Sequence, residues 1–229
     1  MITGATGGIG SALARMLAEQ GCGLVLTGRN ATALKKLSKE LSSNRIEVFS
    51  AICDVRDQVA VQELAVSIEG KFHHIDILIN NAGIGHPEAP VDKLSPGVWT
   101  DVIGTNLTGM FLVTHFALPL FRRGGAIVNN LSIAARNVFP GSAAYSASKH
   151  GALGFTNTLR EELRNRRIRV IALLPGATAT EIWQTIWPNA PRAKMMSPET
   201  VARAVVNTLL QPIDSTIEEL LIMPPDGRL

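Results

Sequence analysis

The sequence predicts an α/β protein, with a doubly wound parallel sheet and helices on both faces, in three layers and one domain. Six short apolar runs alternate with six amphipathic stretches along the 229 residues. The runs are apolar at consecutive positions, which is typical of strands buried on both faces in a parallel sheet. The composition agrees, because 46% of the residues are hydrophobic, only 5% are aromatic and 20 are glycine.

The expected strands are spread over the whole chain, at 24–27, 46–52, 75–79, 126–129, 170–174 and 220–223. Amphipathic stretches of helical period lie at 11–20, 31–42, 57–70, 98–122, 143–165 and 199–210. Because strands and helices alternate, parallel pairing with helices on either face is expected. No repeat, low-complexity tract or linker interrupts the pattern, so we expect one domain over residues 1–229.

Charge and composition argue against several classes of function. The net charge of +3 is modest, and we interpret the basic run 160–169 as the solvated end of a helix rather than a nucleic-acid patch. The 2 cysteines and 5 histidines lack the spacing of a disulfide framework or a metal site. With no leader segment and no apolar run of about 18 residues, we expect a cytoplasmic protein that binds neither membrane nor metal.

A glycine-rich segment opens the chain and leads directly into the first amphipathic stretch. Its glycines, Gly4, Gly8 and Gly10, have the spacing G-x-x-x-G-x-G. Glycines allow a tight turn and let backbone N–H groups approach a pyrophosphate at a helix N-terminus. The spacing differs from the G-x-G-x-x-G dinucleotide pattern. Taken alone, the segment could equally be an ordinary turn and helix start.

Tyr145 and Lys149 are the second motif. Tyr145 is the only tyrosine, and a residue four positions later lies on the same helix face. A phenol has an ordinary pKa of about 10, and a neighbouring ammonium lowers it toward the range useful for acid–base chemistry. Such a pair is also common on solvated helix faces, so its meaning depends on what surrounds it.

With these two motifs, the chain resembles the short-chain dehydrogenase/reductase family, of the single-domain type that carries Tyr-x-x-x-Lys. Further family motifs follow in the expected order at the ends of predicted strands. They are Asn80-Asn-Ala-Gly83, Asn106, Ser132 and the stretch from Pro175 to Thr180. The resemblance covers essentially the whole chain, and it implies a Rossmann-type domain that binds NAD(P).

The resemblance implies four catalytic residues. Tyr145 exchanges a proton with the carbonyl or alcohol oxygen of the substrate, while Lys149 lowers the pKa of Tyr145 and holds the nicotinamide ribose. Ser132 orients and polarises the carbonyl group. Asn106 helps to hold a water that relays protons to Lys149. From the residues alone, Ser132 could instead cap a turn, and Asn106 could cap or kink the helix around it.

The resemblance also implies a set of cofactor-binding residues at the strand ends. They are Gly4, Thr6, Gly8, Ile9, Gly10, Arg29, Asp54, Asn81, Ala82, Gly83, Tyr145, Lys149, Pro175, Gly176, Thr178 and Thr180. Asp54 is expected at the adenine ring, the alternative being an exposed turn acid. Gly28 stands where related NAD enzymes carry an acid for the ribose 2′-hydroxyl. Arg29 follows it and suits a 2′-phosphate, so NADP(H) is expected in preference to NAD(H), unless Arg29 is only a solvated residue at a helix start.

Residues 180–197 are expected to form a lid over a small-molecule substrate. Trp183 and Trp187 either pack on a helix face or form an apolar wall, and with Ser132 and Tyr145 they are the predicted substrate residues. The predicted activity is NADP(H)-dependent interconversion of a ketone or aldehyde with an alcohol. The alternatives are reduction of a 3-oxoacyl thioester, an epimerase or dehydratase reaction, and non-catalytic nucleotide sensing on the same fold.

Both ends of the sequence depart from the family pattern. Only Met1 and Ile2 precede the glycine loop, although the first strand of this fold lies mid-sheet and strands usually have about 5–6 residues. We expect that residues are missing here or that the start is misassigned. The stretch 224–229 lacks the glycine-rich tail of many tetrameric relatives. We therefore expect either a homodimer through the 106–122 and 143–165 helices or a homotetramer.

Overall fold

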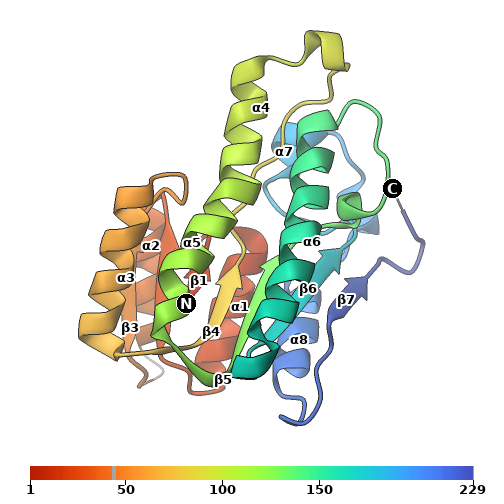
Figure 1. The fold of residues 1–229 in the computed structure, drawn as a ribbon. Coiled ribbons are helices and arrows are strands. Elements are labelled where there is room, and N and C mark those ends of the chain that lie inside the picture. Colours follow the sequence, from red (N-terminus) through yellow and green to blue (C-terminus); the bar gives the residue numbers. More distant parts are fainter. Residues whose placement is uncertain (43–44, 229) are drawn as a thin grey trace.

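A computed structural model describes residues 1–42 and 45–228, so residues 43, 44 and 229 of the expected domain lie outside the described part. Within that part, seven parallel strands form one sheet in the order β3-β2-β1-β4-β5-β6-β7, which confirms the predicted fold class (Figure 1). The strands are β1 Ile2–Thr3, β2 Leu24–Gly28, β3 Val48–Ile52, β4 Ile75–Asn80, β5 Phe121–Asn130, β6 Arg169–Pro175 and β7 Glu219–Ile222.

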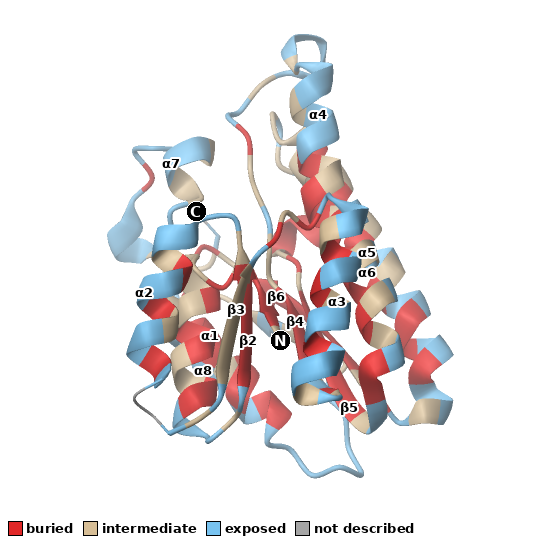
Figure 2. Cartoon of the chain, turned by 90° about the vertical axis from the view of Figure 1, so that its left-hand side faces the viewer, coloured by how far each residue is buried: buried red, intermediate tan, exposed pale blue. Residues whose placement is uncertain are grey.

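Helices cover both faces of the sheet, and Figure 2 shows the two layers on either side of the strands. The helices that contribute to the first core are α1 (Gly8–Glu19), α2 (Ala31–Leu41) and α8 (Pro198–Leu209). Those that contribute to the second are α3 (Gln58–Phe72), α5 (Gly109–Ala117) and α6 (Ala143–Leu163). Successive strand residues enter opposite cores: Leu24 and Leu26 pack in the first, and Val25 packs in the second. This alternation explains why the strands are apolar at consecutive positions.

The first strand is short, as its sequence requires, and it nevertheless lies in the middle of the sheet. β1 pairs with β2 through Ile2 and Thr3, and with β4 through Ile2. The backbone N–H of Ile79 also donates to the carbonyl oxygen of Met1 at 2.9 Å. The glycine loop therefore leaves the sheet at its centre, between the turns that follow β2 and β4.

The prediction of one continuous helix over 98–122 was wrong, because the helical stretch is interrupted and ends before Phe121. The structure has α4 (Pro96–Ile103), a π-helical turn at Gly104–Thr108, α5, and a 3₁₀ turn at Leu118–Leu120. Strand β5 then begins at Phe121, five residues before the predicted position 126. The run Pro96–Leu120 is long and apolar enough to cross a membrane, but half of its most apolar window is buried inside the protein, as in the core helix of a folded domain.

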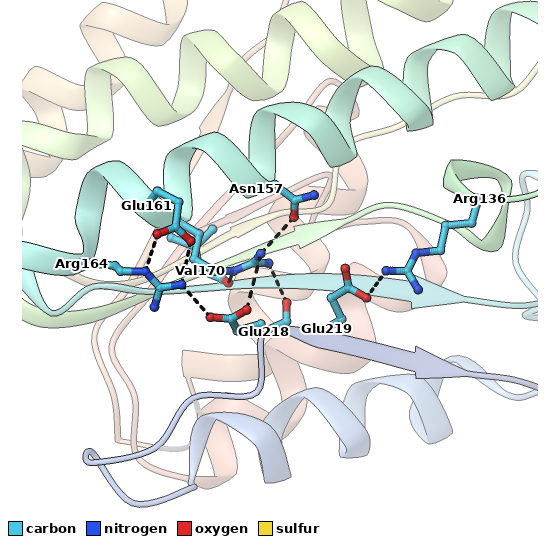
Figure 3. A network of polar contacts seen from close by, with 8 residues as sticks. Arg136, Asn157, Glu161, Arg164, Val170, Glu218 and Glu219 are labelled. Carbon is cyan, nitrogen blue, oxygen red and sulfur yellow. Dashed lines mark hydrogen bonds and ion pairs between the residues drawn. The ribbon is translucent and has the colours of Figure 1, made fainter.

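Arg160 corrects the prediction that 160–169 is a solvated basic face, because this residue is only 7% exposed. Its guanidinium donates to the carbonyl oxygens of Val170 (2.9 Å) and Glu218 (2.8 Å), joining α6 to β6 and to the residue before β7. Figure 3 shows the surrounding network, in which Arg164 pairs with Glu161 and Glu218 at the surface. A buried guanidinium needs such acceptors, and here they fix the far end of α6, the helix that carries Tyr145.

Candidate active site

A cavity of about 690 Å³ opens at the carboxyl ends of the strands, where ligands bind in open parallel sheets. It is lined by the segments that follow β1 to β6. Every predicted site residue lines this cavity except Gly10 and Asn106. The structure therefore brings together residues that are distributed over nearly the whole sequence.

The glycine loop forms a tight turn directly before α1. Gly4 adopts φ +59°, in the left-handed region, and the N–H of Gly7 donates to the carbonyl oxygen of Gly4 at 3.1 Å. A Cβ added to Gly10 would lie 2.3 Å from that same oxygen, so Gly10 acts beneath the loop rather than at the cavity wall. The cap of α1 is Gly7, which has no side chain, so its first N–H groups are free of side-chain acceptors.

Asn81 ties this loop to the sheet. Its Nδ2 donates to the carbonyl oxygens of Thr3 (3.1 Å) and Gly4 (3.0 Å), so the side chain holds the backbone of the loop. Its Oδ1 accepts from Nδ2 of Asn130 at 2.8 Å. Sequence reasoning missed Asn130, which ends β5 and also lines the cavity. The sequence feature that could have identified Asn130 is an amide side chain at the end of a buried strand, two residues before Ser132.

Tyr145 and Lys149 lie on the first turns of α6 and both line the cavity. Lys149 Nζ is 5.6 Å from the centre of the Tyr145 ring and donates to the carbonyl oxygen of Asn130 at 2.9 Å. Burial lowers the pKa of Lys149 to about 8. Burial raises the pKa of Tyr145, and a hydrogen bond with Ser132 acts in the opposite direction. The sequence led us to expect that Lys149 lowers the pKa of Tyr145, but burial is the largest influence on this pKa and Lys149 is not among its causes.

Ser132 lies just after β5, where it caps a turn and affects Tyr145. Its Oγ accepts from the N–H of Ala134 at 3.1 Å, which caps the short 3₁₀ turn at Ile133–Ala135. The Ser132 side chain also acts to lower the pKa of Tyr145. The cap thus fixes the position of a hydroxyl near the phenol.

Asn106 is fully buried in the π-helical turn and does not line the cavity. Its Oδ1 accepts from the N–H of Ile84 at 2.8 Å, and its Nδ2 donates to the carbonyl oxygen of Ile84 at 2.9 Å. The same Nδ2 also donates to Ser148 Oγ at 3.0 Å. The side-chain amide thus joins the kinked helix, the loop after β4 and α6, and it fixes their relative positions.

Residues 1–191 match the family described as short chain dehydrogenase. The chain belongs to this family. Sulfoacetaldehyde reductase 2 of Chromohalobacter salexigens is 36% identical over 98% of this chain and 93% of its own. A solved alcohol dehydrogenase of the archaeon Thermococcus sibiricus, complexed with 5-hydroxy-NADP, is 30% identical, with a TM-score of 0.92 over 100% of this chain and 97% of its own. A closed serine dehydrogenase complexed with NADP+ is 31% identical, with a TM-score of 0.91 over 100% and 97% of the two chains.

At one end of the dehydrogenase cavity, Asp54 is held by Arg56. The Arg56 guanidinium contacts the Asp54 carboxylate through two nitrogens, at 2.7 to 3.1 Å, and the backbone N–H of Arg56 adds a third donor. These donors hold the pKa of Asp54 below its ordinary value. Arg29 also lines this end, is exposed, and makes no ion pair with any described residue.

The predicted lid lines the dehydrogenase cavity only within residues 180–187, where the chain forms the short helix α7 (Trp183–Ile186). Trp183 Nε1 donates to the carbonyl oxygen of Thr178 at 2.8 Å, which anchors the lid to the segment after β6. The rings of Trp183 and Trp187 meet edge to face, with centres 6.5 Å apart. Both tryptophans line the cavity, so the two alternatives are compatible: the rings pack against each other and also form part of the cavity wall. Ile186 lies against Gly85, in the loop after β4.

Proposed function

We propose that this short-chain dehydrogenase is a cytoplasmic, NADP(H)-dependent enzyme that interconverts a ketone or aldehyde and an alcohol. The observation that carries the proposal is the meeting of Ser132, Tyr145 and Lys149 at one wall of the cavity. These residue types together suit proton transfer to an oxygen atom and stabilisation of the charge that develops on it.

Each residue has a distinct task in carbonyl reduction. Tyr145 carries the proton, since its raised pKa keeps the phenol protonated at neutral pH. Ser132 donates a hydrogen bond to the substrate oxygen and polarises the carbonyl group. Lys149, whose pKa is about 8, is mostly charged at neutral pH and stabilises negative charge as it develops on oxygen. The nicotinamide cofactor supplies or takes up the hydride.

The cavity residues fit a dinucleotide. The first N–H groups of α1 face the cavity at Gly8 and Ile9 without a side-chain cap, as a pyrophosphate requires. A Cβ on Gly4 would lie 2.9 Å from the backbone of Ala82, so the close approach of these two loops depends on glycine. Asp54, already oriented by Arg56, would bind the adenine ring, and Lys149 the nicotinamide ribose.

The preference for NADP(H) rests on Arg29, an unpaired cation at the end of β2 within the described residues. Its guanidinium suits a 2′-phosphate, and two of the similar solved structures hold NADP+ or 5-hydroxy-NADP. Replacing Arg29 with Asp should shift the ratio of NADPH to NADH affinity by about tenfold or more toward NADH. Lys35→Asp makes the same charge change at an exposed position outside the cavity, and it should leave the ratio unchanged.

Removal of one hydroxyl group tests the function. Tyr145→Phe should lower the rate of cofactor oxidation with a panel of ketones and aldehydes by about 10²–10⁴-fold, the usual contribution of a positioned acid. Binding of NADPH, followed by its fluorescence, should be unchanged. Full activity in the variant would disprove the acid–base role, and an intact biological effect without turnover would favour a nucleotide sensor.

We also propose a homodimer through the outer surfaces of α5 and α6. Phe111 of α5 is 46% exposed and packs edge to face on Phe155 of α6, with ring centres 6.2 Å apart. An aromatic side chain with this much exposure suits the centre of an interface. Phe111→Glu should therefore convert the protein to a monomer in light scattering, whereas Val66→Glu, on the exposed face of α3, should not.

A further inference from the structure

The substrate end of the cavity contains a buried polar atom without a partner. His86 lines the cavity and is 3% exposed. Its Nε2 is shielded from solvent and has no hydrogen-bond partner among the described residues. A buried polar atom left unpaired costs about 1–3 kcal/mol, and such atoms are uncommon in folded proteins. Because His86 lines the cavity, we ask whether a bound ligand is the missing partner of Nε2.

The other ring nitrogen of His86 determines what Nε2 can do. Nδ1 lies 2.7 Å from the carbonyl oxygen of Pro87. A carbonyl oxygen can only accept, so Nδ1 carries the hydrogen and donates it. In the neutral ring Nε2 is then the acceptor, with its lone pair unused. Its chemical complement is an O–H or N–H group.

The loop that carries His86 is fixed on both sides. Ile84 is held through its N–H and carbonyl oxygen by Asn106, and the N–H of Ala89 donates to the carbonyl oxygen of Gly141 at 3.0 Å. Gly85, directly before His86, is in contact with Ile186 of the lid. The imidazole is thus held firmly at the place where the lid meets the cavity wall.

Charges near this end favour the same type of ligand. Two carboxylates, Glu88 and Glu181, line the cavity beside the loop and the lid. Among the described residues, the cations that line the cavity are Arg29, at the adenosine end, and Lys149, which donates to Asn130. A site with carboxylates and an imidazole acceptor repels an anionic group and attracts a hydroxyl or an ammonium.

We propose that the substrate carries a second polar group, an alcohol hydroxyl or a protonated amine, and that His86 Nε2 accepts a hydrogen bond from it. The inference rests on the proposed carbonyl reductase function and names its substrate class: hydroxy- or amino-carbonyl compounds. Apolar side chains, Trp183 and Ile186 among them, line the same end of the cavity. Specificity would then come from one hydrogen bond, with apolar contacts and the two carboxylates around it.

Matched substrates test the proposal. One series is butanone, hydroxyacetone, aminoacetone and acetoacetate, in which the terminal methyl group of butanone is replaced by a hydroxyl, an ammonium or a carboxylate. A longer series is acetophenone with para ethyl, hydroxymethyl, aminomethyl or carboxymethyl groups. In at least one series, kcat/KM for the hydroxyl or ammonium member should exceed that of the methyl member by about tenfold or more, with the carboxylate the poorest.

Two variants of His86 identify the atom responsible. Asn can still donate to Pro87 but has no group at the Nε2 position. His86→Asn should therefore abolish the preference for the hydroxyl or ammonium member, while kcat/KM for the methyl member stays within about twofold of the wild-type value. Gln places its amide near the Nε2 position, and His86→Gln should retain part of the preference. His150→Asn is the matched control, because the His150 ring also contacts a backbone carbonyl, at 2.9 Å, but is exposed and lies outside the cavity.

A second measurement is independent of turnover. The NMR signal of His86 Nε2 should shift when propylene glycol, the product from hydroxyacetone, is added, and not when sec-butanol, the product from butanone, is added. Equal kcat/KM values within each series, or an equal loss for all members in His86→Asn, would overturn the inference and leave the reductase function standing. If wild type reduced no member while still binding NADPH, the proposed function itself would be contradicted, and this inference with it.

Discussion

The two ends of the cavity are built in different ways. At the nucleotide end, backbone and amide groups are joined by hydrogen bonds, from Thr3 and Gly4 through Asn81 to Asn130 and on to Lys149. At the substrate end, apolar side chains of the lid rest on a loop whose histidine has an unpaired nitrogen. Hydrogen bonds fix positions closely, whereas apolar contacts tolerate displacement. We infer that the nucleotide end is preorganised and that, at the substrate end, the lid adjusts to its ligand above a fixed loop.

Gly10 and Gly85 allow the rigidity of the two ends to be compared by substitution. A Cβ on Gly10 would lie 2.3 Å from the backbone oxygen of Gly4, and a Cβ on Gly85 would lie 2.4 Å from Cγ1 of Ile186. The distances are almost equal, but the obstacles differ. A backbone oxygen inside a hydrogen-bonded loop cannot move, while a side chain in a lid can.

Gly10→Ala should have the largest effect. Because the loop must deform, we expect NADPH affinity to fall by about 100-fold and the free energy of unfolding to fall by about 1–3 kcal/mol, as for other overpacked sites. Fluorescence titration and denaturant unfolding measure the two quantities. Gly70→Ala is the control, since a Cβ there meets nothing within 4 Å and alanine favours a helix. Normal NADPH binding by Gly10→Ala would show that the nucleotide end is as adaptable as the lid.

The pH dependence of reduction tests the hydrogen-bonded end in a second way. The pKa of Lys149 is lowered to about 8, so its ammonium is lost as the pH rises through that value. The pKa of Tyr145 is raised, so the phenol stays protonated over the same range. We expect kcat/KM for reduction to be level below pH 8 and to fall by up to about tenfold per pH unit above it.

Lys149→Arg supplies the control for this profile. A guanidinium stays charged throughout the range, so the fall near pH 8 should disappear even if the overall rate is lower. A wild-type profile that is flat up to pH 10 would contradict the role given to the Lys149 charge.

The contrast between the ends also explains what the sequence could predict. Gly4, Asn81, Ser132 and Lys149 were predicted because their motifs resemble those of the family, and all four line the cavity. Six of the seven parallel strands followed from apolar runs, whereas β1, with only Ile2 and Thr3, has no such run. The break at Gly104–Thr108 was foreseen only as an alternative, a kink at Asn106, because a π-helical turn keeps the apolar composition of the helix around it. Burial of Arg160 was missed for a related reason, since its acceptors are backbone oxygens of distant strands.

Asn130→Leu should have a smaller effect than the Gly10 variant and should separate binding from chemistry. Leucine removes the donor to Asn81 Oδ1, while the backbone oxygen of residue 130 still accepts from Lys149. We expect a loss of stability of about 1–2 kcal/mol and a rise of about fivefold in KM for NADPH, with kcat changed less than twofold. Asn130→Asp has the same shape but sets a carboxylate oxygen against Asn81 Oδ1, so its losses should be at least as large. A large fall in kcat with an unchanged KM would show instead that the side chain acts on the chemical step.

Gly85→Ala should have the smallest effect, and it decides whether the lid is adaptable. The added methyl group meets Ile186 Cγ1 and Cδ1, which are displaced if α7 shifts or the side chain changes rotamer. We expect KM for the carbonyl substrate to rise about threefold, with NADPH affinity and melting temperature unchanged. In the double variant Gly85→Ala/Ile186→Ala the obstacle is gone. Its KM should therefore rise by less than the product of the rises caused by the two single variants. Additive effects, or weakened NADPH binding in Gly85→Ala, would mean that the contact is part of the rigid framework and that the two ends of the cavity do not differ in this respect.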